Sequence, residues 1–241
     1  MKMFTLNRLS FITLLTVILH YTVDAQATNL KYYSQCGQDS FIHQNYFPNK
    51  TDGVYVEIGA HDGINISNTY FFEQLGWRGM CIEPITEIFE ILQRNRNENC
   101  ICIEGAISDN DGTASFMYVK GPEAMLSGLI DKYDPRHADR VQRDGKSTNC
   151  EFILRTVQCY KLCDLLEKYD MHHIDYLSID TEGGELDILK TIDYSKFDID
   201  VITVEDNFGY PEIKSFLNQK GFAFMGNLRH DLLFRNKKYC Y

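Results

Sequence analysis

The chain has 241 residues, of which 44% are hydrophobic and 24% are charged, and its formal net charge at pH 7 is -10. This composition suits one globular domain with a sizeable core. The negative charge argues against binding a phosphate backbone through bulk electrostatics, so we expect no nucleic-acid partner.

The N-terminal segment has the pattern of a secretory signal peptide. Basic residues precede an apolar run at residues 11–23, and an A-x-A-like cleavage pattern follows at residues 25–27. The run is short for a membrane span, which needs about 20 apolar residues. We therefore predict a signal peptide at residues 1–25 and one domain at residues 26–241, with no stable membrane span after cleavage. The protein would be secreted or reside in the lumen of the endoplasmic reticulum or Golgi, and an uncleaved anchor is the alternative.

All eight cysteines lie beyond this segment, so an oxidising lumen would favour one or two disulfides, whose pairing the sequence does not fix. Cys100 and Cys102 lie in a predicted strand, which favours core packing over a metal or redox site. Two sequons begin at Asn49 and Asn65. Asn49 lies in a turn that is open to glycosylation, whereas a glycan at Asn65 would obstruct the site described next.

Residues 54–63 read Val-Tyr-Val-Glu-Ile-Gly-Ala-His-Asp-Gly and predict a buried strand that ends in a glycine turn. Residues 65–68 are rich in types that cap helix N-termini, so we expect a helix next. The pattern lacks GxGxxG, in which the second glycine lets the backbone approach a pyrophosphate. Glu57 at the end of the strand, beside Gly59 and Gly63, suits instead a cationic ligand such as S-adenosylmethionine.

A second acid follows the next strand, at residues 80–84. In a doubly wound sheet this position faces the ligand crevice, where Glu83 can accept hydrogen bonds from both ribose hydroxyls. A third strand is predicted at residues 100–107. Ser108 and Asp109 after it would lie where an adenine edge can be hydrogen-bonded, and a turn that satisfies its own side chains is the alternative.

The remaining periodicity alternates between helices and strands. Residues 121–150 are charged and interrupted by proline, and we interpret them as a lid with Ser127 and Arg136 as candidate contacts; a surface excursion is the alternative. We expect His172 and His173 in a loop, because adjacent residues do not share a helix face as paired metal ligands would. Further helices are predicted at residues 69–75, 85–92, 162–169, 186–192 and 211–221, and further strands at residues 113–119, 152–160, 174–179, 201–204, 222–225 and 232–235.

Two carboxylates, Asp180 and Glu182, follow the strand at residues 174–179. They are costly to bury without partners or a role. One can orient the cofactor amine or the methyl acceptor, and the other can remove the acceptor's proton. Asp206 and Asn207 follow the next strand, and with Asp180 they would form a set of oxygen ligands for a Mg²⁺-type ion. Acids at strand ends are common without a metal, and we assign none.

Taken together, these motifs resemble the FkbM family of S-adenosylmethionine-dependent O-methyltransferases. The resemblance covers most of the chain after the signal, and its most specific block is Asp-x-Glu-Gly-x-Glu at residues 180–185. The closing hairpin at residues 222–235 agrees with it, since a terminal antiparallel strand is expected of class I methyltransferases. The matching blocks are Ser34-Gln35-x-Gly37-Gln38-Asp39, Glu57-Ile58-Gly59-Ala60-x-Asp62-Gly63, Gly76-Trp77-Arg78-Gly79, Ile82-Glu83-Pro84, Ala106-Ile107-Ser108, Ile179-Asp180-x-Glu182-Gly183-x-Glu185 and Val204-Glu205.

The resemblance implies an α/β, Rossmann-like class I methyltransferase fold: a mostly parallel seven-stranded sheet with a C-terminal antiparallel hairpin. It also implies S-adenosyl-L-methionine as cofactor. With the residue patterns above, the expected cofactor-binding residues are Glu57, Gly59, Ala60, Asp62, Gly63, Glu83, Ser108 and Asp109. The expected catalytic residues, each a candidate general base, are Asp180, Glu182 and His61.

Characterised members of the family methylate hydroxyls of sugars or polyketides, which implies a glycan or small-molecule acceptor. Within the family the chain looks most like the animal-type, Star-like branch, in which the scaffold acts in secretory trafficking of a growth-factor precursor. A non-catalytic luminal adaptor with a protein partner is therefore the alternative function. A dehydrogenase ranks third because GxGxxG is missing.

Overall fold

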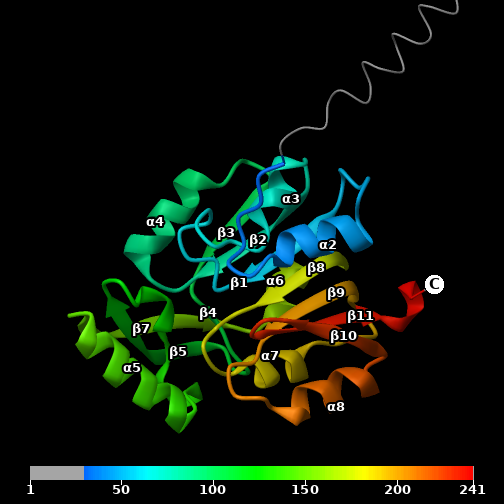
Figure 1. Ribbon diagram of the computed structural model, residues 1–241. Coiled ribbons are helices and arrows are strands. Elements are labelled where there is room, and N and C mark those ends of the chain that lie inside the picture. The colour runs from blue at the N-terminus through cyan, green and yellow to red at the C-terminus, as the bar shows by residue number, and fades with distance from the viewer. Residues whose placement is uncertain (1–29, 241) are drawn as a thin grey trace, which may run out of the picture. The chain divides into compact units, whose positions relative to one another are not determined.

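The strands within residues 30–240 form two sheets, which Figure 1 shows with the helices packed around them. The computed structural model describes residues 30–240, of which residues 32–240 belong to one compact unit. The predicted signal peptide at residues 1–25 lies outside the described residues. The helices and strands, in chain order, are α2 (Gln38–Tyr46), β1 (Val54–Ile58), α3 (Tyr70–Gln74), β2 (Arg78–Glu83), α4 (Thr86–Asn95), β3 (Cys100–Glu104), β4 (Ala106–Ile107), β5 (Gly112–Lys120), β6 (Gly128–Leu129), α5 (Pro135–Ser147), β7 (Glu151–Tyr160), α6 (Leu162–Lys168), β8 (His173–Ile179), α7 (Glu185–Thr191), β9 (Asp198–Glu205), α8 (Pro211–Gln219), β10 (Phe222–Leu228) and β11 (Asp231–Asn236).

The large sheet has seven strands in the order β10-β11-β9-β8-β1-β2-β3. The pairs from β9 to β3 are parallel, and β11 is antiparallel to both β9 and β10. This confirms the predicted α/β fold with a mostly parallel seven-stranded sheet and a C-terminal antiparallel hairpin. Because β1, β2, β8 and β9 run in the same direction, their carboxyl ends meet at one edge of the sheet.

Both faces of the large sheet are covered, as expected for parallel strands. Along β1, side chains alternate between the two faces. Val54, Val56 and Ile58 join the core formed with α6, α7 and α8, whereas Tyr55 joins the core formed with α2, α3 and α4. Figure 1 shows α2 and α3 above the sheet and α7 and α8 below it. Burial on both faces explains why every residue of β1 except Glu57 is apolar or aromatic.

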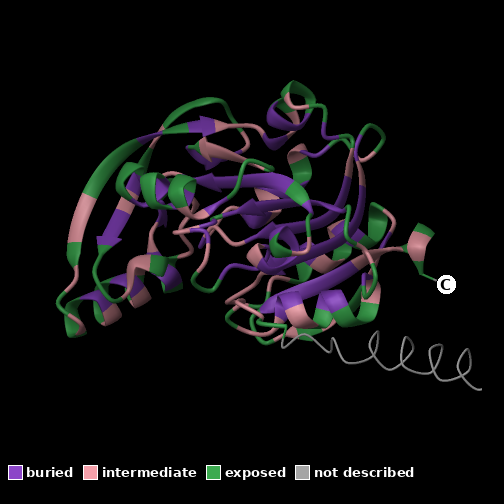
Figure 2. Ribbon diagram, turned by 90° about the horizontal axis from the view of Figure 1, so that it is seen from above, coloured by how far each residue is buried: buried purple, intermediate pink, exposed green. Residues whose placement is uncertain are grey.

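The small sheet has four strands in the order β4-β7-β5-β6. The central strands β1, β2, β8 and β9 are buried along most of their length, whereas the long strands β5 and β7 carry many exposed or half-buried residues. Figure 2 shows buried and exposed strand segments in different colours. The prediction of one strand at residues 100–107 is wrong, because β3 belongs to the large sheet and β4 to the small one. Gly105, with φ of 151°, separates them, and a Cβ there would lie 2.8 Å from the carbonyl oxygen of Gln158.

The segment at residues 121–150 has more regular structure than its sequence predicts, because it contains β6 and the helix α5. Asp134 caps this helix by accepting a hydrogen bond from the backbone N–H of Arg136, and Pro135 occupies its first turn. The expectation that His173 lies in a loop is also wrong, since it opens β8 and pairs with Asp175 and Asp198.

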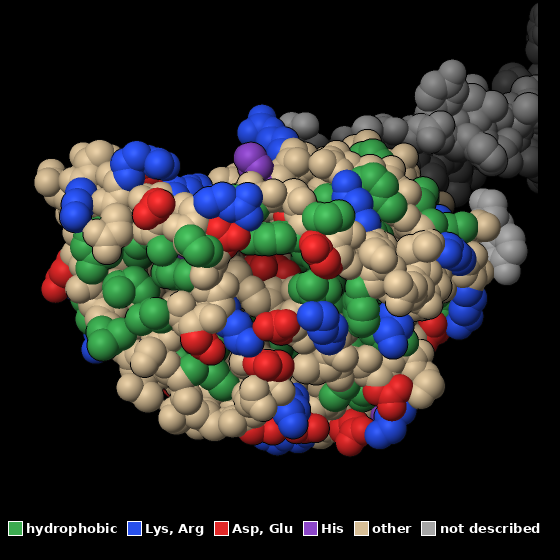
Figure 3. Space-filling model, turned by 90° about the horizontal axis from the view of Figure 1, so that it is seen from below, with side chains coloured by type: hydrophobic (Ala, Val, Ile, Leu, Met, Phe, Trp, Pro, Cys, Tyr) green, Lys and Arg blue, Asp and Glu red, His purple; other side chains and the backbone are tan. Residues whose placement is uncertain are grey.

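All eight cysteines lie among the described residues and carry free thiols, so the predicted disulfides are not formed in this structure. The Sγ atoms of Cys100 and Cys102 lie 3.9 Å apart on β3. None of the helices within residues 30–240 combines the length and apolarity that a membrane crossing requires. Lys and Arg side chains are interspersed with Asp and Glu on the face seen from below in Figure 3.

Candidate active site

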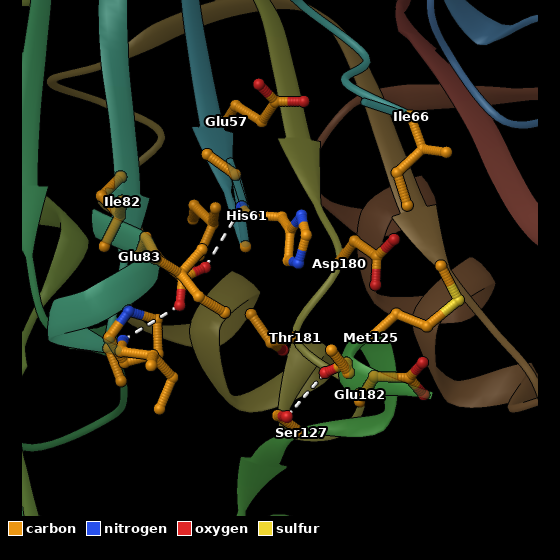
Figure 4. Close-up of a pocket in the computed structure, with 18 of the residues that line it drawn as sticks. Glu57, His61, Ile66, Ile82, Glu83, Met125, Ser127, Asp180, Thr181 and Glu182 are labelled. Atoms are coloured by element: carbon orange, nitrogen blue, oxygen red, sulfur yellow. Dashed lines mark hydrogen bonds between the residues drawn. The ribbon is translucent and has the colours of Figure 1, made fainter. Parts of the chain in front are cut away.

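A cavity of about 260 Å³ opens where β1, β2 and β8 end, and residues of the 121–129 segment form its opposite wall. Figure 4 shows the acids and His61 on the strand-end side, with Met125 and Ser127 facing them. Seven of the predicted site residues line this cavity, namely Glu57, Gly59, Ala60, His61, Glu83, Asp180 and Glu182. The fold therefore brings together residues that are far apart in the sequence.

Gly59 allows the loops after β1 and β8 to touch. Its φ is +84°, and a Cβ at this position would lie only 1.8 Å from the backbone oxygen of Asp180. The N–H of Asp180 in turn donates to the backbone oxygen of Ile58 at 3.1 Å. Only glycine fits this contact without moving one loop away from the other.

Glu57 lies at the cavity floor with both carboxylate oxygens engaged by protein donors. Oε1 accepts from the N–H of Asn68 at 2.6 Å, and Oε2 accepts from Thr69 Oγ1 and from Arg96 Nη2, both at 2.7 Å. The Ser67 hydroxyl lies within hydrogen-bond distance of both oxygens. Glu57 lines the predicted cofactor cavity, and its contacts show that it organises residues 67–69.

Glu83 ends β2 with its carboxyl group buried at the cavity. The backbone N–H groups of Ile85 and His61 donate to its two oxygens at 2.9 and 3.1 Å. Burial raises the pKa of Glu83 to about 7, although both of these hydrogen bonds act in the opposite direction. Each carboxylate oxygen has a second acceptor direction, so Glu83 can receive two further hydrogen bonds.

Two buried polar atoms on the cavity wall have no hydrogen-bond partner, Nδ1 of His61 and Oδ1 of Asn68. Asn68 is held in place because its N–H binds Glu57 and its Nδ2 donates to Ser178 Oγ at 2.9 Å. Unpaired buried polar atoms are rare in folded proteins and point to a missing partner. Sequence reasoning identified Asn68 only as a candidate helix cap and missed its place in the cavity.

The cavity also collects unusual backbone conformations. His61, Ile66 and Glu182 line it with φ of 48°, 56° and 57°. Positive φ is a strained conformation for a β-branched residue such as Ile66. Strain of this kind is concentrated at functional sites, where the surrounding structure holds it in place.

The Asp-x-Glu-Gly-x-Glu block gives its three acids three different environments. Glu185 braces the loop, because its Oε1 accepts from the N–H of Gly183 at 2.8 Å and the hydroxyl of Thr181 at 2.9 Å. Asp180 faces the cavity, where burial and the neighbouring Glu182 raise its pKa well above the ordinary value. The buried Glu182 lies 3.2 Å from both His137 Nδ1 and Asn207 Nδ2.

Of the oxygen ligands considered for a Mg²⁺-type ion, Asp206 and Asn207 are held by other contacts. The carboxylate of Asp206 accepts from the N–H groups of Gly209 and Tyr210, and Asn207 donates its amide to Glu182. The residue that joins Asp180 and Glu182 is Glu205, and oxygens of these three acids lie within 4.8 Å of one another. Side chains alternate along β9, so the last strand residue points to the site and the next one points away.

Four predicted cofactor-binding residues do not line the cavity. Asp62 accepts from the backbone N–H groups of Ile64 and Asn65, so it shapes the turn. Gly63 packs against Leu92 and Arg96 of the neighbouring helix region. Ser108 donates to Asp109, and Asp109 forms an ion pair with Lys132 at 2.9 Å, as in the alternative of a self-satisfied turn.

Of the two candidate lid contacts, Ser127 lines the cavity and Arg136 does not. The Ser127 hydroxyl donates to the backbone oxygen of Ala124 and accepts from the N–H of Val119, which fixes the turn. Arg136 pairs with Asp134 and lies over the ring of Phe208. The cavity wall on this side is otherwise apolar, with contributions from Ile85, Ile88, Phe116, Met125 and Leu129.

The profile of the family described as methyltransferase FkbM domain matches residues 57–224. The chain belongs to this family. The matched range begins at Glu57 and extends into β10, so it contains the whole cavity. This match confirms the predicted FkbM family, whereas the predicted domain bounds, residues 26–241, stay a prediction.

Individual relatives are distant. Methyltransferase sdnD of Sordaria araneosa is 24% identical over 164 residues, which cover 59% of this chain and 63% of that protein. Methyltransferase FkbM from Methylobacillus flagellatus is similar in structure with a TM-score of 0.44 and 12% identity, over 77% of this chain and 44% of that chain. A TehB-like SAM-dependent methyltransferase from Corynebacterium glutamicum has a TM-score of 0.42 and 8% identity, over 92% of this chain and 96% of that chain.

The residues present fit S-adenosylmethionine. This ligand brings two ribose hydroxyls, an ammonium group and a positive sulfur, all of which call for acceptors or negative charge. The cavity offers the free acceptor directions of Glu83, the unpaired Oδ1 of Asn68 and the carboxyl group of Asp180. Its apolar wall suits a flat aromatic base.

Proposed function

We propose that the protein transfers a methyl group from S-adenosylmethionine to a hydroxyl group of a glycan or another hydroxyl-bearing small molecule. One observation carries the proposal: the acceptor-rich cavity at the strand ends of a methyltransferase FkbM domain. Its unpaired buried atoms, His61 Nδ1 and Asn68 Oδ1, lie on the same wall as Glu83 and Asp180.

The roles of the cofactor-facing residues follow from their free hydrogen-bonding capacity. Glu83 accepts from the ribose hydroxyls, because each of its oxygens has one acceptor direction left over from the backbone. Asn68 accepts from the ammonium group through its unpaired Oδ1. Gly59 keeps the loops after β1 and β8 in contact, since a Cβ there would meet the backbone of Asp180.

When bound, the cofactor supplies an electrophilic methyl group. His61 then serves to take the proton of the acceptor hydroxyl, which Asp180 orients. Figure 4 shows the imidazole of His61 between Glu83 and Asp180, which places a base beside the carboxyl group of Asp180. Most of the rate would come from positioning by these residues.

We also propose that the acceptor is met in the secretory pathway. The supporting features are the N-terminal signal pattern and the sequon at Asn49. The alternative, a non-catalytic luminal adaptor of the Star-like kind with a protein partner, uses the same fold and predicts no cofactor binding.

The test is calorimetric titration of the mature protein with S-adenosylmethionine and, separately, with NAD. We expect micromolar binding of S-adenosylmethionine, no binding of NAD, and loss of binding in Glu83→Ala. Asp109→Ala is the matched control, because this acid lies outside the cavity. Asp180→Asn should lose methyl transfer to a glycan panel. A folded protein that binds no S-adenosylmethionine would overturn the proposal in favour of the adaptor.

A further inference from the structure

Three acids form a cluster at the ends of β8 and β9. Oxygens of Asp180, Glu182 and Glu205 lie within 4.8 Å of one another. Like charges at this distance destabilise one another. Lys132 lines a neighbouring cavity together with Glu182 and Glu205, but its ammonium group is paired with Asp109 and Asp187, each at 2.9 Å.

A histidine from another part of the fold lies beside Glu182, one of the three acids. His137 lies on α5, its side chain is 1% exposed, and its Nδ1 is 3.2 Å from Oε2 of Glu182. This nitrogen nevertheless makes no hydrogen bond. Its other nitrogen, Nε2, lies 3.2 Å from the backbone oxygen of Leu126. A carbonyl oxygen only accepts, so Nε2 carries the proton and, in the neutral imidazole, Nδ1 has a free lone pair.

The unpartnered Nδ1 and the carboxylate oxygen lie 3.2 Å apart, a separation at which both atoms can bind the same cation. The carbonyl of Leu126 fixes the tautomer, as the outer partners of metal-binding histidines do. The four side chains come from three places: the loop after β8, the end of β9 and α5. We propose that Asp180, Glu182, Glu205 and His137 bind one divalent metal ion.

The ligand set selects among ions. Carboxylates suit Mg²⁺, Ca²⁺ and Mn²⁺, whereas an imidazole ligand favours first-row transition metals. Three carboxylates with one imidazole therefore favour Mn²⁺ over Mg²⁺. The ion would also join α5 to the strand ends, which couples the 121–150 segment to the site.

The site borders two cavities, because Glu182 lines both the proposed cofactor cavity and a second one of about 270 Å³. The second cavity has Phe208 and Tyr210 in its wall. An ion between the two would bind the hydroxyl oxygen of the acceptor. This role rests on the proposed function, whereas the binding of the ion does not.

The test is a titration of the chelator-treated full protein with Mn²⁺, followed by electron paramagnetic resonance. Free Mn²⁺ gives a six-line signal. We expect the protein to lower the amplitude of this signal by the equivalent of one Mn²⁺ per chain. Glu205→Gln should weaken binding at least about tenfold. Asp206→Asn is the matched control, because that carboxylate is held by its own turn, and it should bind like the unchanged protein.

Pulsed measurements on the bound Mn²⁺ should detect coupling to a directly bonded nitrogen, which His137→Gln should abolish. The midpoint temperature of thermal unfolding can be measured on the unchanged protein. Mn²⁺ should raise this temperature more than Mg²⁺ does. Absence of Mn²⁺ binding up to about 1 mM, retention of binding in Glu205→Gln, or bound Mn²⁺ without nitrogen coupling would overturn the proposed ligand set.

Calorimetry with S-adenosylmethionine on the same metal-free sample separates the two proposals. Cofactor binding without Mn²⁺ binding would remove the metal site and leave the methyltransferase intact. Mn²⁺ binding without cofactor binding would support the metal site and overturn the proposed function.

Discussion

The two walls of the cavity are fixed in different ways. On the strand-end wall, backbone contacts leave no freedom, as at Gly59 against Asp180, and acids such as Glu57 are saturated by protein donors. On the opposite wall, the apolar side chain of Met125 is 38% exposed and makes no comparable network. The strand-end wall therefore has a fixed geometry, whereas the opposite wall contributes apolar side chains that other apolar side chains can replace.

The strand-end wall therefore carries the residues proposed for cofactor binding and catalysis, whereas the 121–129 wall affects which ligand fits. Residues that hold a cofactor or move a proton need positions fixed by the sheet, because small displacements reduce the rate strongly. A loop segment that contacts the ligand only through apolar side chains tolerates substitution. Changes on the strand-end wall should therefore affect folding and binding severely, and changes on the 121–129 wall should shift affinity modestly.

The largest effect should come from Gly59→Ala. The new Cβ would meet a backbone oxygen, which moves only with its strand, so the loops after β1 and β8 must separate. We expect a loss of more than about 3 kcal/mol in the free energy of unfolding and no S-adenosylmethionine binding. Chemical denaturation and calorimetry measure the two effects.

Gly209→Ala is the matched control for this change. Gly209 has a similar φ of +76°, but a Cβ there meets nothing within 4 Å. Gly209→Ala should lower the free energy of unfolding by about 1 kcal/mol, the conformational strain of a positive φ. Equal losses in the two variants would show that the contact between Gly59 and Asp180 has no special importance.

The next largest effect should come from Glu57→Gln. It removes one partner of a buried ion-pair cluster in which Arg96 also pairs with Glu73 at 3.2 Å. Breaking a buried pair by changing one partner costs about 3 kcal/mol or more, because the other charge stays buried. Glu87→Gln breaks an exposed pair with Arg155 and should cost less than about 1 kcal/mol. Urea unfolding curves that shift equally would contradict this account.

The sequence predicted those parts of the cavity that local patterns determine, and it did not predict those that depend on how distant elements pack. The β-branched run of β1, its glycine turn and the acids after β2 and β8 were predicted, because local patterns determine them. Glu205 and His137 were not predicted as members of the acidic cluster. Their place depends on the order of β8 and β9 in the sheet and on the packing of α5, neither of which has a local signature.

The helix α5 itself was missed for a physical reason. Val141 and the half-buried Ala138 are among its few apolar residues, so the helical period is hard to see. Its start did carry a signal in Asp134-Pro135, an N-cap followed by a first-turn proline. The strand was predicted to end at residue 204, whereas β9 extends to Glu205, so this acid lies at the strand end beside Asp180 and Glu182.

A moderate effect is expected from the pH dependence of cofactor affinity. The pKa of Glu83 is about 7 in the free protein, so its carboxyl group is mostly protonated below this pH and ionised above it. Hydroxyl donors of the ligand bind the ionised form better, so affinity should rise as pH increases from about 6 to 8, by up to about tenfold.

Calorimetry at several pH values measures this rise. Glu83→Gln should bind weakly and show a flat profile. Glu104→Gln is the control, because Glu104 is the exposed register partner of Glu83 on β3 and should keep the slope. An unchanged slope in Glu83→Gln would assign the pH dependence to another group.

The smallest effect should come from Met125→Ala on the opposite wall. This change removes apolar cover from the cavity while leaving the strand ends untouched, so affinity for cofactor or acceptor should fall by about twofold to tenfold. The free energy of unfolding should change by less than about 0.5 kcal/mol, because the side chain is already exposed. Ile130→Ala, which is equally exposed but does not line the cavity, should leave affinity unchanged. A large loss of stability in Met125→Ala would show that this wall is part of the folded core, and the contrast between the two walls would fail.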